Sequence, residues 1–178
     1  MMPVFSPRSV SRMRVALSLA LLLVAAGCGD RVDAKASLEL SDVVTGWFDA
    51  GLVDGKNKLV PTVTFKLHNK APDAIRSVQI NAVFRVIGDQ EELGSAFVRG
   101  IDANGLPGGG TTSTFVLRST LGYTGEQPRL QMLQHSQFRD AQVEVFAKHG
   151  SDQWVKLAQY QVARQLLTGD DAAKQPSN

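Results

Sequence analysis

Few residues in this sequence have the type and spacing that catalysis or metal binding requires. The chain has 178 residues, with three histidines and one cysteine. His68, His135 and His149 lack the closely spaced second ligand of zinc-binding helices and knuckles. A single cysteine excludes an internal disulfide and a cysteine-rich zinc site. We therefore expect solvated histidines, no metal ion and no dissociable cofactor.

The glycine-rich and acidic segments do not complete a catalytic site either. Residues 105–110 contain four glycines, but a phosphate-binding loop also needs a following helix and usually a lysine. Residues 111–115 instead have the composition of a strand. The adjacent carboxylates at 91–92 and at 170–171 would point to opposite faces of a strand, so neither pair is an acid–base pair. We expect a protein that is not an enzyme.

Four aromatic residues are candidates for a partner or ligand surface, because exposed aromatic side chains often mark such surfaces. Trp47 and Phe48 follow the first apolar segment, Tyr123 lies between two glycines, and Trp154 begins the last apolar segment. Trp154 and Tyr160 have the same strand parity, so we expect them on one face. The competing interpretation is that Trp47 and Trp154 are core residues, since large aromatics are mostly buried.

The N-terminal segment has the three parts of a secretory signal. Residues 1–27 contain three arginines and no acidic residue, and an apolar run of 13 residues extends from Val15 to Gly27. A membrane-spanning helix needs about 20 apolar residues, so this run is too short. A positive flank, a short apolar core and small residues at its end predict an export signal rather than a buried helix.

The apolar run ends in Leu23-Val24-Ala25-Ala26-Gly27-Cys28, which resembles the lipobox of bacterial lipoproteins. The resemblance implies cleavage between Gly27 and Cys28. It also implies a thioether-linked diacylglycerol on Cys28 and usually an N-acyl lipid on the new amino terminus. Ala25 stands where leucine is commonest. The alternative for Cys28 is a free thiol in an ordinary secreted protein, but a lone cysteine in an exported chain favours lipidation.

The resemblance also implies a location. Two or more acyl chains hold a protein firmly on a membrane, and no second apolar stretch of about 18 residues follows. In didermal bacteria an aspartate directly after the lipidated cysteine favours the inner membrane, whereas here Gly29 occupies that position. We expect a lipid-anchored, periplasm-facing protein of the cell envelope, in the outer membrane rather than the inner.

The charge of the chain changes when the predicted signal is removed. The full sequence has 19 basic and 17 acidic residues, a formal charge of +2. Residues 1–27 carry three of the basic residues, so the remaining chain has 16 basic and 17 acidic residues and a net charge of −1. No run of Lys or Arg remains, which excludes the electrostatic signature of nucleic-acid binding.

The remaining chain alternates apolar and polar residues with period two, which predicts half-buried β-strands. Val63, Phe65 and Leu67, for example, would share one face. Clusters of Gly, Asn, Asp and Pro separate the segments. Seven strands are predicted, over about 38–44, 61–69, 75–87, 93–99, 112–118, 141–148 and 154–164.

Two segments interrupt the strand pattern. Residues 49–58, rich in Gly, Asp and Asn, are predicted to form a loop. Pro128 suits a first helical turn, and the apolar pair Leu130 and Leu133 follows it, so we predict one short helix over 127–135, between the fifth and sixth strands. The predicted order is a signal peptide at 1–27, a lipidated cysteine with a polar tether at 28–36, one β domain at 37–168 and a disordered tail at 169–178.

Seven short strands separated by frequent turns are typical of β-sandwiches. No sustained period of 3.6 residues supports a helical fold. We predict an all-β fold, an immunoglobulin-like two-sheet sandwich without an inter-sheet disulfide.

Three segments within residues 60–117 resemble the FxLYD-type and LEA14-like immunoglobulin-type domains of exported bacterial proteins. The resemblance implies a binding or scaffolding module and transfers no catalytic residue. Its segments are Thr64–Lys70, a strand ending in an Asn turn; Ile75–Phe84, a long strand; and Leu106–Gly109 with Thr114–Leu117 after it.

These observations predict a membrane-anchored lipoprotein of the cell envelope whose non-enzymatic β-sandwich binds or scaffolds another envelope protein. Two alternatives stay open: a lipoprotein that binds a glycan or a lipid, and a secreted enzyme whose site is assembled only in space. Exposure of Trp47, Tyr123 or Trp154 beside a groove would favour a glycan or lipid ligand. Polar side chains converging in a deep pocket would favour an enzyme.

Overall fold

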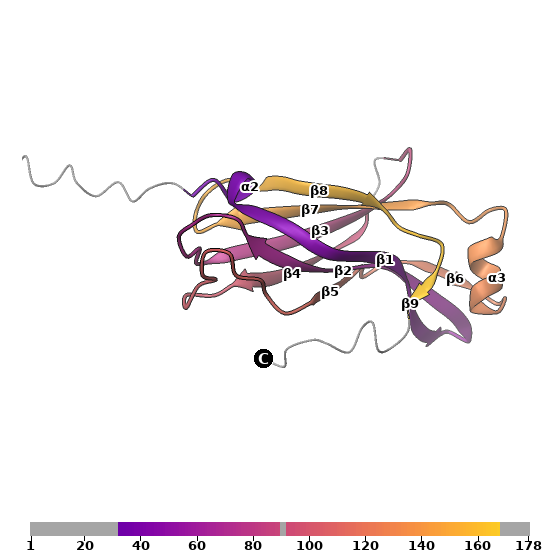
Figure 1. Cartoon of the computed structure of the whole chain (residues 1–178). Coiled ribbons are helices and arrows are strands. Elements are labelled where there is room, and N and C mark those ends of the chain that lie inside the picture. Colours follow the sequence, from indigo (N-terminus) through magenta and orange to yellow (C-terminus); the bar gives the residue numbers. More distant parts are fainter. Residues whose placement is uncertain (1–31, 90–91, 168–178) are drawn as a thin grey trace, which may run out of the picture. The chain divides into compact units, whose positions relative to one another are not determined.

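The computed structural model describes residues 32–89 and 92–167. The predicted signal peptide, Cys28 and the predicted tail lie outside the described residues. The described chain is a sandwich of two β-sheets with two short helices (Figure 1). Its elements are α2 (Ala34–Ser37), β1 (Leu38–Val53), β2 (Lys56–Asn69), β3 (Val78–Val86), β4 (Glu92–Ile101), β5 (Phe115–Arg118), β6 (Tyr123–Gly125), α3 (Arg129–Gln134), β7 (Ala141–His149), β8 (Val155–Gln161) and β9 (Leu166–Leu167).

The first sheet has the order β5-β2-β1-β9, with β6 also pairing with β2, and the second has the order β4-β3-β7-β8. Neighbouring strands are antiparallel except β1 and β9, which run parallel. The prediction of an all-β two-sheet sandwich is confirmed. All seven predicted segments contain strands, and the short strands β6 and β9 were not predicted.

The predicted loop at 49–58 is wrong, because this segment is a β-hairpin. β1 continues to Val53, β2 starts at Lys56, and the two central residues Asp54 and Gly55 have φ values of 51° and 77°. Two consecutive positive φ angles define the type I′ turn that matches the twist of paired strands. A register shift between Asp49 and Leu52 breaks the apolar alternation, and this irregularity hid the strand.

The folded domain begins earlier than predicted. Residues 34–36 were expected in the polar tether, but they belong to α2, whose first turn is capped by the Asp33 carboxylate. Ala34 is buried in the core and Val32 packs against it. The second helix, α3, confirms the predicted helix before β7, although it is shorter than the predicted 127–135.

The core lies between the inner faces of the two sheets. Val63, Phe65 and Leu67 of β2 are fully buried on one side, as are the inward residues of β3 and β7 on the other. Burying one such side chain contributes about 1.5–3 kcal/mol, so this double apolar layer dominates the stability of the sandwich. The alternation predicted for β2, β3 and β7 is confirmed on these inner faces.

A buried amide closes one end of the sandwich. The Asn69 side chain is fully buried at the end of β2. Its Nδ2 donates to the carbonyl oxygens of Asp73, Leu106 and Pro107, and its Oδ1 accepts from the Ala71 amide. Asn69 therefore joins the loop after β2 to the glycine-rich loop after β4, because each buried polar group there needs a partner.

We predict that Asn69→Ala lowers the free energy of unfolding by about 2–4 kcal/mol, since it removes four hydrogen bonds of a buried amide, each worth about 0.5–1.5 kcal/mol. The Leu106 and Pro107 carbonyls keep the Ile75 and Gly110 amides as donors. Urea denaturation of the purified protein measures the change. The matched control is Asn57→Ala, which removes a single exposed hydrogen bond to the Gln127 carbonyl. Equal losses in the two variants would contradict the role assigned to Asn69.

Candidate functional site

Trp47 is a core residue and not part of a binding surface. Its side chain is 0% exposed and packs against the rings of Tyr123 and Phe138, with centroid distances of 5.5 and 4.8 Å. Its indole Nε1 has no hydrogen-bond partner within the described part of the chain. The competing interpretation of Trp47 as a core residue is correct.

Phe48 faces the opposite side of the same strand. It is half-buried, and the guanidinium carbon of Arg118 lies 3.7 Å from its ring centroid. Burial lowers the pKa of the Arg118 guanidinium, because the charged form loses contact with water. Phe48 thus already has a partner in the domain, a cation–π contact on the outside of the first sheet.

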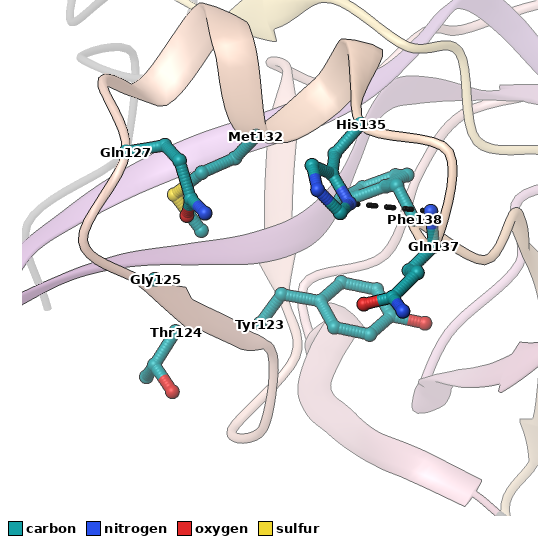
Figure 2. A pocket seen from close by; sticks show the side chains of 8 residues that line it. All are labelled: Tyr123, Thr124, Gly125, Gln127, Met132, His135, Gln137 and Phe138. Carbon is teal, nitrogen blue, oxygen red and sulfur yellow. Dashed lines mark hydrogen bonds between the residues drawn. The ribbon is translucent and has the colours of Figure 1, made fainter.

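Tyr123 lines a shallow pocket beneath α3 (Figure 2). Its ring lies 4.8 Å from that of Phe138, and Met132 also borders the pocket. Burial raises the pKa of Tyr123, so the phenol is neutral and donates a hydrogen bond to the Arg139 carbonyl oxygen. Gly122 allows β6 to lie this close to β2, since a Cβ there would stand 2.0 Å from the Leu59 carbonyl oxygen.

The pocket beneath α3 is too small for a typical organic ligand. Its volume is about 230 Å³, below the roughly 300–1,000 Å³ of small-molecule sites. Its polar groups are Gln127, His135 and Gln137, and His135 Nδ1 accepts a hydrogen bond from the Gln137 amide. Within the described residues, carboxylates are absent from its lining, and the titratable side chains that border it are His135 and Tyr123.

Trp154 is exposed, unlike Trp47. It precedes β8, and its ring contacts that of Phe97 on β4 at 6.2 Å, with the planes at 80°. β4 and β8 are opposite edges of the second sheet, so the two rings meet across the outer surface of β3 and β7. Phe97 is 62% and Trp154 41% exposed. Interpreting Trp154 as a core residue is wrong.

The expected common face of Trp154 and Tyr160 is also wrong. Val145 pairs with Ala158, but the next residue, Phe146, pairs with Lys156. The extra residue in β8 is a bulge, and one inserted residue reverses the parity of every position beyond it. Tyr160 therefore packs against the core, while Trp154 lies outside.

One half of this outer face is an ion-pair network. Arg85 pairs with Glu144 at 2.5 Å and with Glu92 at 2.6 Å, and Lys156 pairs with Glu144 at 2.9 Å. Gln159 bonds both Lys156 and Gln142. The polar side chains of this network satisfy one another.

The other half of the outer face has no such internal pairing. Register places Arg99, Gln79 and Lys148 side by side across β4, β3 and β7, and Asn81 lies between Phe97 and Phe146 in the next row. Among the described residues, no hydrogen bond or ion pair engages the side chains of Arg99, Gln79, Lys148 or Asn81. We call this set the open patch: Gln79, Asn81, Phe97, Arg99, Phe146, Lys148 and Trp154.

A hollow of about 240 Å³ adjoins the open patch. Gln79 and Arg99 form part of its wall, together with Asp102 and Gly150 from neighbouring turns. The Asp102 carboxylate accepts hydrogen bonds from Asn104 and Gly105, so it is engaged in its own turn. The hollow therefore adds one carboxylate, Asp102, to the wall that Arg99 shares, although no ion pair joins the two side chains.

The remaining candidates from the sequence are two histidines and the glycine-rich segment. His68 contacts Thr111, and His149 contacts Asp152 at 3.3 Å. Within residues 32–89 and 92–167, no group of three or more His, Cys, Asp or Glu could hold a metal ion. The glycine-rich segment at 105–110 connects β4 to β5 and is not followed by a helix. No helix in the described part is long and apolar enough to span a membrane.

No family model matches the chain, and no curated protein matches it. Several solved structures show a distant likeness, and two of them serve as examples. One is the X-ray structure of Northeast Structural Genomics Consortium target SoR45, with 10% identity over 73% of this chain and 89% of that one, and a TM-score of 0.42. The other is the solution structure of AT1g01470 from Arabidopsis thaliana, with 10% identity over 79% and 91%, and a TM-score of 0.42.

The opposite environments of the two tryptophans predict a simple spectroscopic result. Iodide quenches only exposed indoles, so the emission of the native protein should be partly quenched. Trp154→Phe should leave the emission of buried Trp47, which iodide barely reaches. Stern–Volmer titration measures this, and unchanged quenching in Trp154→Phe would show that Trp154 is not the exposed indole.

Proposed function

We propose that this protein is a lipoprotein of the bacterial cell envelope whose β-sandwich binds another envelope protein and performs no catalysis. The observation that carries this proposal is the open patch, where exposed aromatic rings adjoin polar side chains that the domain itself does not use. Aromatic and arginine side chains dominate the energetics of protein interfaces. The patch has this composition on the flat face of a sheet.

The lipid anchor in this proposal rests on the lipobox-like sequence that ends at Cys28. Asp33 already caps α2, and it follows Cys28 by only five positions along the chain. An extended chain covers at most about 3.3–3.6 Å per residue, so lipidation would hold the start of α2 within roughly 17 Å of the bilayer surface. A partner of the domain would then also be an envelope protein.

A second candidate is a glycan as ligand, which the exposure of Trp154 favours. Sugar rings stack on the open face of an aromatic ring, whereas the two rings here stand at 80° and do not form one flat platform. The edge-to-face geometry instead favours an amino-acid side chain of a protein partner, inserted between the two rings. We therefore rank a protein partner first.

We predict that Cys28→Ala accumulates as an unprocessed, non-lipidated precursor, because the thiol that would carry the diacylglycerol is gone. Mass spectrometry of the intact protein and detergent-phase partitioning measure processing and anchoring. Gly29→Asp is the matched control: it keeps the thiol and, by the resemblance, shifts the protein toward the inner membrane. Normal membrane anchoring of Cys28→Ala would refute the anchor.

We predict that the double variant Phe97→Ser, Trp154→Ser loses its partner in pull-downs from crosslinked envelopes, by roughly tenfold or more, as expected for interface hot spots. The matched control is Leu130→Ser on α3, which removes an apolar side chain of similar exposure, 60%, outside the patch. Equal recovery of the same proteins with both variants would argue against the open patch as the binding surface.

A further inference from the structure

We propose that the open patch recognises an acidic segment of its partner, with an apolar or aromatic side chain inserted between Phe97 and Trp154 and flanking carboxylates on Arg99 and Lys148. This inference rests on the proposed function and names the chemistry of the partner. Its basis is the division of one sheet face into a half whose charges are paired and a half whose charges are not.

The charge of the open patch is the first argument. Arg99 and Lys148 stand in one row with Gln79 between them, and no acidic residue lies in that row or in the neighbouring row of Phe97, Asn81 and Phe146. Strands are about 4.8 Å apart, so the two cations are separated by roughly 10 Å between backbones. This spacing allows two carboxylates of one extended chain to pair with them at the same time.

The paired half of the face shows that the exposed cations are not a general feature of this sheet. Glu144 there receives both Arg85 and Lys156, and Glu92 receives Arg85 as well. Cations that form no ion pair within the domain attract an acidic partner, since complementary charge speeds encounter and disfavours wrong partners. A basic or neutral partner would leave Arg99 and Lys148 unpaired when the surface is covered.

The aromatic corner is the second argument. Phe97 and Trp154 contact each other edge to face, so each leaves part of its ring exposed next to the cation row. An apolar side chain in this corner would bury aromatic area, which contributes about 25 cal/mol per Å² removed from water. Gln79 and Asn81 remain as hydrogen-bonding groups for the backbone of the bound segment.

The test uses the purified full-length protein in neutral detergent and three probes. The first is a labelled random copolymer of glutamate and tyrosine, the second is the polysaccharide alginate, which carries carboxylates but no aromatic groups, and the third is soluble glycerol phosphate, which has the anionic group of a phospholipid headgroup without acyl chains. We expect the copolymer to bind best and to quench Trp154 emission. Stronger binding of alginate or of glycerol phosphate, or binding of none of the three, would overturn the inference.

The role of each cation is tested by Arg99→Gln and Lys148→Gln, which remove the charge and keep a polar side chain. Each should weaken copolymer binding roughly two- to fivefold, and added salt should reduce the difference, as for exposed charge pairs. The matched control is Lys156→Gln on the same face, whose ammonium already pairs with Glu144. An equal effect of Lys156→Gln would show that only net charge matters and would contradict the assigned contacts.

The outcome also separates this inference from the proposed function. If envelope pull-downs depend on Phe97 and Trp154 but are unaffected by Arg99→Gln and Lys148→Gln, the patch binds a partner that is not acidic. The inference then fails and the proposed function stands. If the aromatic substitutions have no effect on recovery, the proposed function fails.

Discussion

Each strand of a two-sheet sandwich must place every second side chain in the core. This requirement determines both the stability of the domain and which side chains reach its surface. The inward residues of β2, β3 and β7 are fully buried or nearly so, and their packing between the sheets dominates the stability of the described domain. Outward positions of β3 and β7 are mostly less buried and can carry other chemistry, whereas β2 is buried on both faces of the first sheet where Thr62 and Thr64 lie. On the second sheet the outward positions carry an ion-pair network and the open patch side by side.

The same constraint explains how far the sequence predicts the fold. Where alternation is uninterrupted, as in β2, β3 and β7, the strands and their buried faces follow from period two. The errors occur where a bulge or a turn interrupts the period. The register shift near Gly51 hid a long hairpin, and the extra residue in β8 moved Tyr160 to the core face.

The candidate surface was only partly predictable. Trp154 was a candidate from its type alone, but Phe97 stands within Ala96-Phe97-Val98, three consecutive apolar residues that conceal which one faces outward. Only the register with β3 decides this. The pairing of charges is equally hidden, since Arg85 and Glu144 are 59 residues apart in the chain. Arg99 and Lys148 differ from the neighbouring charged side chains only in the structure, where Arg85, Glu144 and Lys156 form ion pairs and these two do not.

We propose that a protein partner covers the outer face of the second sheet. Photocrosslinking in living cells can detect this partner, with a photoreactive phenylalanine analogue at Phe97 in one strain and at Leu130 in another. We expect a discrete crosslinked protein from position 97 and none from position 130. No adduct from position 97, or the same adduct from both positions, would contradict it.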